Sequence, residues 1–214
     1  MKEPPARVTA PAVRRRGPAS TEDGQRSRDR ILKAALDLIT DTGIDQARLA
    51  EIARRANMSS GQVMYYFTSK GHILLETLAW QEHQDTERRQ AALAKVTGAW
   101  RQLERFIDLY LPTSPADPIW ILWLEAWARA PHNRQVSQFL EDLHTPWLSD
   151  LAAIVESGVQ QGVFVPPAAI GDFALSFAAL LDGLALQRLR QMHMLSRKRA
   201  HELAMHAARR ELAP

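Results

Sequence analysis

The sequence contains no cysteine among its 214 residues. Disulfide bonds, thiolate nucleophiles and cysteine-ligated metal sites are therefore excluded. No uninterrupted apolar run reaches the roughly 18 residues that a transmembrane helix requires, so no membrane span is expected. The first residues also lack the apolar core of a secretory signal, and we expect a cytoplasmic protein that makes no membrane contact.

The sequence has little that indicates catalysis. It holds neither a Gly-x-Ser-x-Gly elbow nor a Gly-x4-Gly-Lys-Ser/Thr phosphate loop. His201 and His206 are five positions apart, whereas a zinc-binding helix needs a spacing of four to put both rings on one face. The other histidines are scattered without ligand spacing. We therefore expect no catalytic residue, no metal site and no cofactor.

Charge is nearly balanced, with 27 basic and 24 acidic residues and a net charge of +3. Any nucleic-acid binding must therefore come from a local surface rather than from the whole molecule. Residues 1–25 form a basic, proline-rich tail that is predicted to be disordered. It is either a solvated extension or an arm that lays Arg14, Arg15 and Arg16 along phosphates or into a minor groove.

Residues 52–71 have the pattern of two short helices joined by a tight turn. Asn57 is expected to end the first helix, because Asn tolerates a positive φ better than most residues. Ser59 opens the second helix and Gln62 follows three residues later. This spacing predicts a capping box, in which each side chain bonds the other residue's backbone N–H.

The second of these helices has few apolar residues that could pack into a hydrophobic core. Val63 and Phe67 are one turn apart and can anchor it. The residues left facing away from that anchor are Ser60, Gln62, Met64 and Tyr65. Hydroxyl, amide and phenol groups on one outer face have the chemistry to read base edges in a DNA major groove.

This region resembles the N-terminal DNA-binding domain of the TetR family of bacterial transcriptional regulators. The matching groups, in order, are Gly43-Ile44, Ile52-Ala53, Ala56-Asn57-Met58-Ser59-Ser60-Gly61 and Tyr66-Phe67-Thr68-Ser69-Lys70. The resemblance implies a helix-turn-helix that binds double-stranded DNA, with Lys70 on a phosphate. We add three further phosphate candidates by their position: Arg48, Ser59 and Tyr66.

Two positions depart from the family pattern. Ala47 stands where the family usually has a phosphate-binding Thr, and Arg48 beside it is a possible substitute. Met64 stands where the recognition helix of the family usually has its first tyrosine. A Met side chain is apolar and can still contact a thymine methyl group.

The rest of the chain also has helical periodicity, and no Val/Ile/Thr alternation is long enough for a sheet. The predicted fold class is all-α: a three-helix DNA-binding domain over residues 26–72, followed by a helical bundle for ligand binding and dimerisation over residues 73–214. The expected helices cover residues 28–40, 48–56, 60–67, 72–95, 100–111, 119–130, 133–143, 147–161, 168–192 and 195–212.

The helices at 147–161 and 168–192 are unusually apolar and rich in small residues. They are either ordinary core helices or a homodimer interface, in which the pair stacks on its twofold copy as a four-helix bundle. The segment 181–187 resembles the C-terminal helix of TetR-family members of the choline-sensing betaine-regulator type. Dimerisation would also place two recognition helices about one DNA turn (about 34–36 Å) apart, as a palindromic operator requires.

Aromatic residues concentrate between residues 106 and 127. Trp120, Trp123 and Trp127 share one helical face, and Phe106 and Tyr110 share a face of the preceding helix. Such a stripe is more often core than pocket. The functional alternative is an effector cavity that takes a quaternary ammonium or other cation by cation–π contact, or a flat apolar molecule. Nearby candidates for polar anchors are Asp117, Glu125, His132 and Asn133.

These features together predict a ligand-responsive, DNA-binding transcriptional regulator rather than an enzyme. The commoner habit of the family implies a repressor that a small molecule releases from a palindromic operator. The alternative is a helical ligand-binding adaptor that has lost DNA binding, which Ala47 and Met64 keep open.

Overall fold

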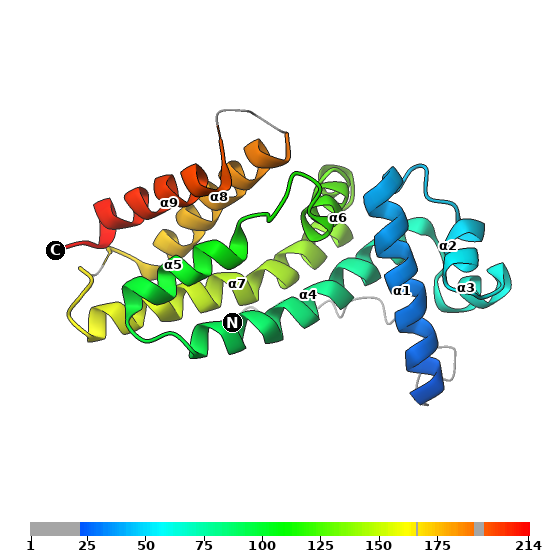
Figure 1. The fold of residues 1–214 in the computed structure, drawn as a ribbon, viewed down its shortest axis with the longest axis horizontal. Coiled ribbons are helices and arrows are strands. Elements are labelled where there is room, and N and C mark those ends of the chain that lie inside the picture. Colours follow the sequence, from blue (N-terminus) through cyan, green and yellow to red (C-terminus); the bar gives the residue numbers. More distant parts are fainter. Residues whose placement is uncertain (1–21, 166, 191–194) are drawn as a thin grey trace, which may run out of the picture.

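The computed structural model describes residues 22–165, 167–190 and 195–214, and all regular structure in these ranges is helical, as predicted. Most of the basic tail, including Arg14, Arg15 and Arg16, lies outside the described residues. The elements are α1 (Glu22–Thr42), α2 (Leu49–Arg55), α3 (Ser60–Tyr66), α4 (Lys70–Ala94), α5 (Ala99–Tyr110), α6 (Pro118–Trp127), the 3₁₀ turn η1 (Ala130–His132), α7 (Arg134–Gln160), α8 (Ile170–Leu189) and α9 (Arg197–Leu212) (Figure 1).

The turn between α2 and α3 has the predicted local structure. Asn57 has a φ of +55°, and the amide of Met58 donates to the carbonyl of Ala53 at 2.9 Å. This is the Schellman arrangement that closes a helix on a left-handed residue. The capping box of Ser59 and Gln62 is present, with both reciprocal bonds formed. The sequence thus directs the chain into α3 through contacts that are almost entirely local.

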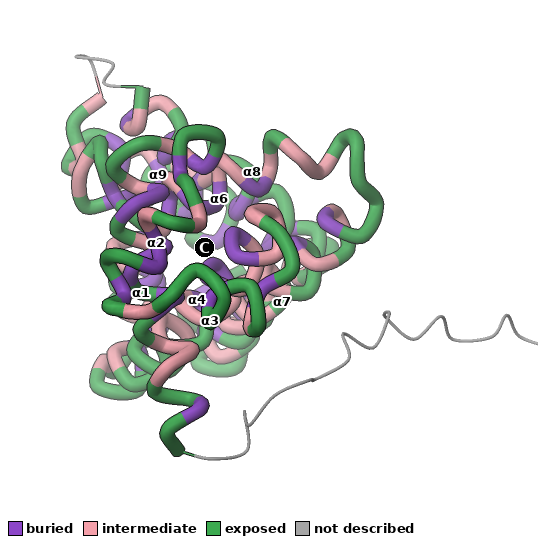
Figure 2. The backbone as a smooth tube through the Cα atoms, turned by 90° about the vertical axis from the view of Figure 1, so that its right-hand side faces the viewer, coloured by how far each residue is buried: buried purple, intermediate pink, exposed green. Residues whose placement is uncertain are grey.

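Two hydrophobic clusters fill the molecule, and α6 and α7 contribute to both. The head cluster takes residues from α1 to α4, together with Leu122 and Ala126 of α6 and Leu140 of α7. The body cluster takes residues from α5, α7, α8 and α9, together with Trp120 of α6. In Figure 1, α6 lies between α1 and the rest of the bundle, and Figure 2 shows the buried residues gathered on the inner sides of the helices. The head cluster therefore extends well beyond residue 72, where the sequence suggested a domain boundary.

The prediction that a helix ends before Pro146 is wrong, because α7 runs without a break from Arg134 to Gln160. An internal proline removes one backbone hydrogen bond and costs about 3 kcal/mol. Both halves of α7 are held by burial: Leu140 lies in the head cluster, and Leu151 and Val155 lie in the body cluster. Tertiary packing on both sides of Pro146 outweighs its local preference.

The longest apolar helix, α8, is interrupted by the charged residues Asp172, Asp182 and Arg188. Among the described residues, α8 is long and apolar enough to span a membrane by composition alone, with a mean hydropathy of 1.3. Two of its charged residues, however, have hydrogen-bond partners inside the bundle. Asp182 accepts a hydrogen bond from Tyr110, and Arg188 donates to the carbonyl of Pro112. We interpret α8 as a bundle helix that leaves an apolar face uncovered.

Gly158 in α7 makes a close contact that only glycine permits. A Cβ atom at this position would overlap the ring of Phe164, which is buried and packs edge-to-face on Trp100. Phe164 also donates its amide to the carbonyl of Gly158 at 3.1 Å, so the ring has little freedom to withdraw.

We expect Gly158→Ala to destabilise the protein by about 1–3 kcal/mol, because it overpacks a filled core. The free energy of unfolding from denaturant titration measures this. The control is Gly171→Ala, since a Cβ at Gly171 in α8 meets open space. Equal stability of the two variants would contradict this account of Gly158.

Candidate DNA-reading helix and ligand pocket

The outer face of α3 is as free as the sequence predicted. Val63 and Phe67 are 0% and 1% exposed and fix the helix to the head cluster. Met64 and Tyr65 are 62% and 51% exposed, which is unusual for large apolar side chains. Ser60 and Gln62 are exposed on the same short helix.

The residues expected to contact phosphates lie around this helix in different environments. Arg48 and Ser59 are exposed, and Tyr66 is half-buried against the head cluster. Lys70 is half-buried, and its ammonium donates to the backbone carbonyl of Asp45 at 2.9 Å. Ala47 is fully buried, so its methyl group fills core space. Arg48, as the residue before α2, is the exposed side chain at that point.

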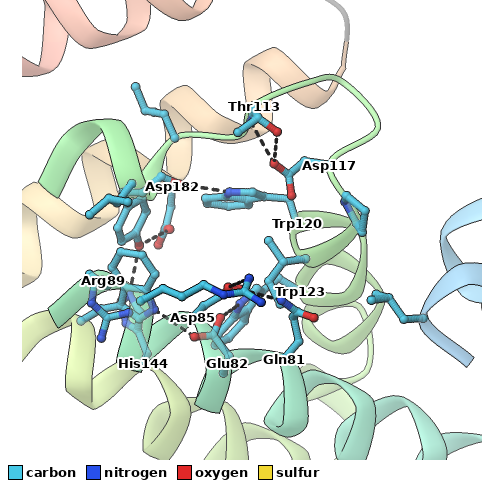
Figure 3. A pocket seen from close by; sticks show the side chains of 18 of the residues that line it. Gln81, Glu82, Asp85, Arg89, Thr113, Asp117, Trp120, Trp123, His144 and Asp182 are labelled. Carbon is cyan, nitrogen blue, oxygen red and sulfur yellow. Dashed lines mark hydrogen bonds and ion pairs between the residues drawn. The ribbon is translucent and has the colours of Figure 1, made fainter. Parts of the chain in front are cut away.

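A pocket of about 390 Å³ lies at the junction of α4, α5, α6, α7 and α8 (Figure 3). Aromatic rings and charged groups alternate around it. The residues with aromatic, charged or titratable side chains in its lining are Glu82, Asp85, Arg88, Arg89, Tyr110, Asp117, Trp120, Trp123, Trp127, His144, Trp147 and Asp182. The predicted aromatic residues are thus brought together, with one exception.

Glu82 of α4 is the buried anion of the pocket. It is 4% exposed, and its two carboxylate oxygens accept the indole N–H groups of Trp123 at 2.6 Å and Trp147 at 3.1 Å. Burial raises the pKa of Glu82, and the two indole hydrogen bonds partly oppose that shift. The carboxylate therefore links α6 and α7 to α4 through two hydrogen bonds.

Tyr110, Asp182 and His144 form a hydrogen-bonded group on another wall. The Tyr110 hydroxyl donates to Asp182 at 2.6 Å and lies 3.0 Å from Nε2 of His144. Because the hydroxyl hydrogen is used on Asp182, Nε2 of His144 must be the donor to the Tyr110 oxygen. Burial raises the pKa values of Asp182 and Tyr110, with Asp182 adding to the second shift, and burial lowers the pKa of His144. Burial thus disfavours the charged form of the imidazole, whereas the charge of Asp182 favours it.

Arg89 supplies a fixed positive charge at the edge of the pocket. Its side chain is 1% exposed, its Nε donates to Asp150 at 2.6 Å, and its guanidinium stacks 3.8 Å from the ring centroid of Trp147. The stacking shows that an indole of this pocket already accepts a cation on its face.

Phe106 is the predicted aromatic residue that does not belong to the lining. It is fully buried behind the pocket, with its ring 5.7 Å from Trp147 and 5.9 Å from Tyr110. Of the expected polar anchors, Asp117 lines the pocket and accepts two hydrogen bonds from Thr113. Three others are used elsewhere or lie outside the lining: Glu125, His132 and Asn133.

Sequence reasoning missed most of the polar lining. Glu82, Asp85 and Arg89 recur at three and four residues along α4, which places them on one helical face. Asp182 is an isolated charge within the apolar stretch of α8. Both patterns are visible in the sequence, but neither reveals that these faces meet at the tryptophans of α6.

Comparisons with known proteins identify the family to which the chain belongs. Residues 31–77 match the family model of bacterial regulatory proteins of the tetR family, and residues 99–213 match that of the BetI-type transcriptional repressor C-terminal domain. The chain belongs to the TetR family. It is a ligand-responsive, DNA-binding transcriptional regulator of the BetI type, and the families that match contain regulators rather than enzymes.

Individual relatives agree with this assignment. The HTH-type transcriptional regulator BetI of Paraburkholderia xenovorans is 30% identical over 167 residues, which cover 75% of this chain and 80% of that protein. BetI of Escherichia coli is 25% identical over 185 residues, covering 84% and 90%. A regulator from Saccharomonospora viridis, solved in complex with choline, superimposes with a TM-score of 0.81 at 28% identity, covering 89% of this chain and 99% of that one.

Proposed function

We propose that this TetR-family regulator is a cytoplasmic repressor that reads a palindromic operator with the α3 helices of a homodimer. Met64 and Tyr65 are the large side chains that α3 holds in solvent, which supports a role at base edges. The proposed base-reading residues are Ser60, Gln62, Met64 and Tyr65. The proposed phosphate-binding residues are Arg48, Ser59, Tyr66 and Lys70.

The homodimer is proposed to form through the uncovered face of α8. Leu175, Leu180 and Leu186 are 59%, 37% and 38% exposed, although each is an apolar side chain on a bundle helix. The small residues Ala179 and Gly183 are exposed between them, which permits close approach of a second helix. The 147–161 part of α7 is a weaker candidate for the interface, because Leu151, Ile154 and Val155 are already buried in the protomer.

The effector is proposed to be a small quaternary ammonium compound of the choline class. The observation that carries this is the buried Glu82 carboxylate, held among Trp120, Trp123 and Trp147 in a cavity large enough for such a molecule. Aromatic faces attract a cation whose methyl groups cannot donate hydrogen bonds, and the carboxylate balances its charge. Asp85 and Asp117 offer acceptors for a hydroxyl group. The choline bound to the Saccharomonospora viridis regulator agrees with this class.

Regulation follows from linkage between the two sites. An effector that favours a dimer with misplaced α3 helices lowers operator affinity, and the operator lowers effector affinity by the same factor, commonly about 5–150-fold. The alternative function, an adaptor that no longer binds DNA, is favoured only by Ala47 and Met64, and selection of bound duplexes decides between the two.

Selection from random duplexes should return a palindrome bound at about 10⁻⁸ M or tighter. We expect Lys70→Ala to weaken binding to every duplex and to lower the slope of log affinity against log salt by about one, because one phosphate contact is lost. Gln62→Ala should instead change which operators are preferred. Weak, sequence-blind binding by the wild type would favour the adaptor.

Leu180→Glu should convert the dimer to a monomer in analytical ultracentrifugation, because it places a charge in the proposed apolar interface. Operator affinity should fall with it, since one α3 helix makes few contacts. The matched control is Val163→Glu, which changes an apolar side chain of similar exposure (37%) that lies outside α8. A dimer unaffected by Leu180→Glu would exclude this face.

Choline binding, measured by calorimetry, should strengthen as the pH rises toward the raised pKa of Glu82 and become constant above it. The bound cation favours the ionised carboxylate, so binding releases a proton whenever Glu82 is protonated in the empty pocket. Glu82→Gln should weaken binding about tenfold or more (about 1.4 kcal/mol) and flatten this pH dependence.

The control is Glu87→Gln, which alters an exposed carboxylate of the same helix and should change neither quantity. Choline affinity that does not depend on pH, or that survives Glu82→Gln, would remove Glu82 from the site.

A further inference from the structure

Helix α6 contacts both the pocket and the DNA-binding head. Trp123 and Trp127 line the pocket. Glu125 follows Trp123 by two positions, about 200° around the helix, and therefore lies on the far side from it. Arg129 comes just after α6, as the residue before η1. Both residues contact the turn between α1 and α2, at residues 43–45.

Glu125 is directly bonded to the backbone of that turn. One of its carboxylate oxygens accepts the amide of Ile44 at 3.2 Å, and the other accepts Nη1 of Arg129 at 3.0 Å. Arg129 also donates to the carboxylate of Asp45 at 3.2 Å. The side chains of Glu125 and Arg129 are only 25% and 31% exposed. Solvent therefore screens the ion pair between these two residues less than it screens a pair on the surface.

The turn is shaped to receive this carboxylate. Gly43 has a φ of +75°, which favours glycine, and a Cβ there would lie 3.1 Å from the Glu125 oxygen. The carbonyl of Asp45 in the same turn accepts the ammonium of Lys70, the first residue of α4 after the recognition helix. The turn therefore connects α6 on one side with the segment that follows α3 on the other.

We propose that Glu125, oriented by Arg129, is the positioning residue that couples the pocket to the DNA-reading helix. An effector that seats against the tryptophans of α6 displaces this helix, and the bond from Glu125 to Ile44 carries the displacement to the turn and to α2 and α3. This coupling runs beside the covalent connection through α4. It rests on the proposed function, because it requires the pocket to be the effector site.

The test compares Glu125→Ala with the wild type in two measurements. Choline affinity without DNA, by calorimetry, should stay within about twofold, because Glu125 does not line the pocket. The ratio of operator affinities without and with saturating choline should fall at least fivefold. Glu125→Gln, which keeps an acceptor for the Ile44 amide, should restore most of that ratio.

The control is Glu141→Ala, which removes an exposed carboxylate of α7 and should leave both measurements unchanged. A wild-type ratio in Glu125→Ala would overturn the proposal. If the wild-type protein does not bind choline, the proposed effector class is wrong. The coupling between Glu125 and the DNA-binding head is then tested by measurements that need no effector. Glu125→Ala must in that case speed hydrogen exchange at the Ile44 amide and change operator affinity while the melting temperature stays close to that of the wild type. Unchanged exchange and operator affinity would overturn it.

Discussion

The pocket depends on one buried carboxylate. Glu82 takes an indole N–H on each of its two oxygens, and these bonds hold Trp123 of α6 and Trp147 of α7 against α4. A buried carboxylate is costly unless it is hydrogen-bonded or paired with a positive charge. The two indoles reduce that cost without neutralising the charge, and the Arg89 cation in the same pocket adds a favourable charge interaction. The interaction that assembles the walls is thus the same one on which the proposed preference for a cationic effector rests.

The second constraint is that α6 contacts several parts of the protein at once. Its tryptophans border the cavity, its Leu122 and Ala126 are buried in the head cluster, and Glu125 bonds the turn before α2. A helix of only ten residues that lies in both contacts links the cavity and the head within about three turns.

The sequence predicted what depends on neighbours along the chain. The left-handed Asn57 and the capping box of Ser59 and Gln62 are set within a few residues, and the structure has both. The predicted helix break at Pro146 is wrong, because burial of α7 in two separate clusters outweighs the local preference of proline to end a helix. The lining of the pocket could be predicted only in part, because tertiary packing decides which residues of other helices reach it. The tryptophans of α6 share a face by periodicity, whereas Glu82 and Asp182 reach them only through tertiary packing. Phe106 was predicted to line the pocket but is buried outside its lining. Helical periodicity predicts which residues share a face, but not which part of the protein that face contacts.

The contribution of α6 and α7 to the head cluster bears on how the protein is made. The helices that read DNA come early in the chain, yet their core includes Leu122, Ala126, Val136 and Leu140. During synthesis the N-terminal part of a protein usually folds first. Here the core of the head includes residues as far along the chain as Leu140, so this core cannot be completely packed before that residue has been synthesised. The packing of the DNA-binding helices therefore depends on α6, a helix that also lines the pocket.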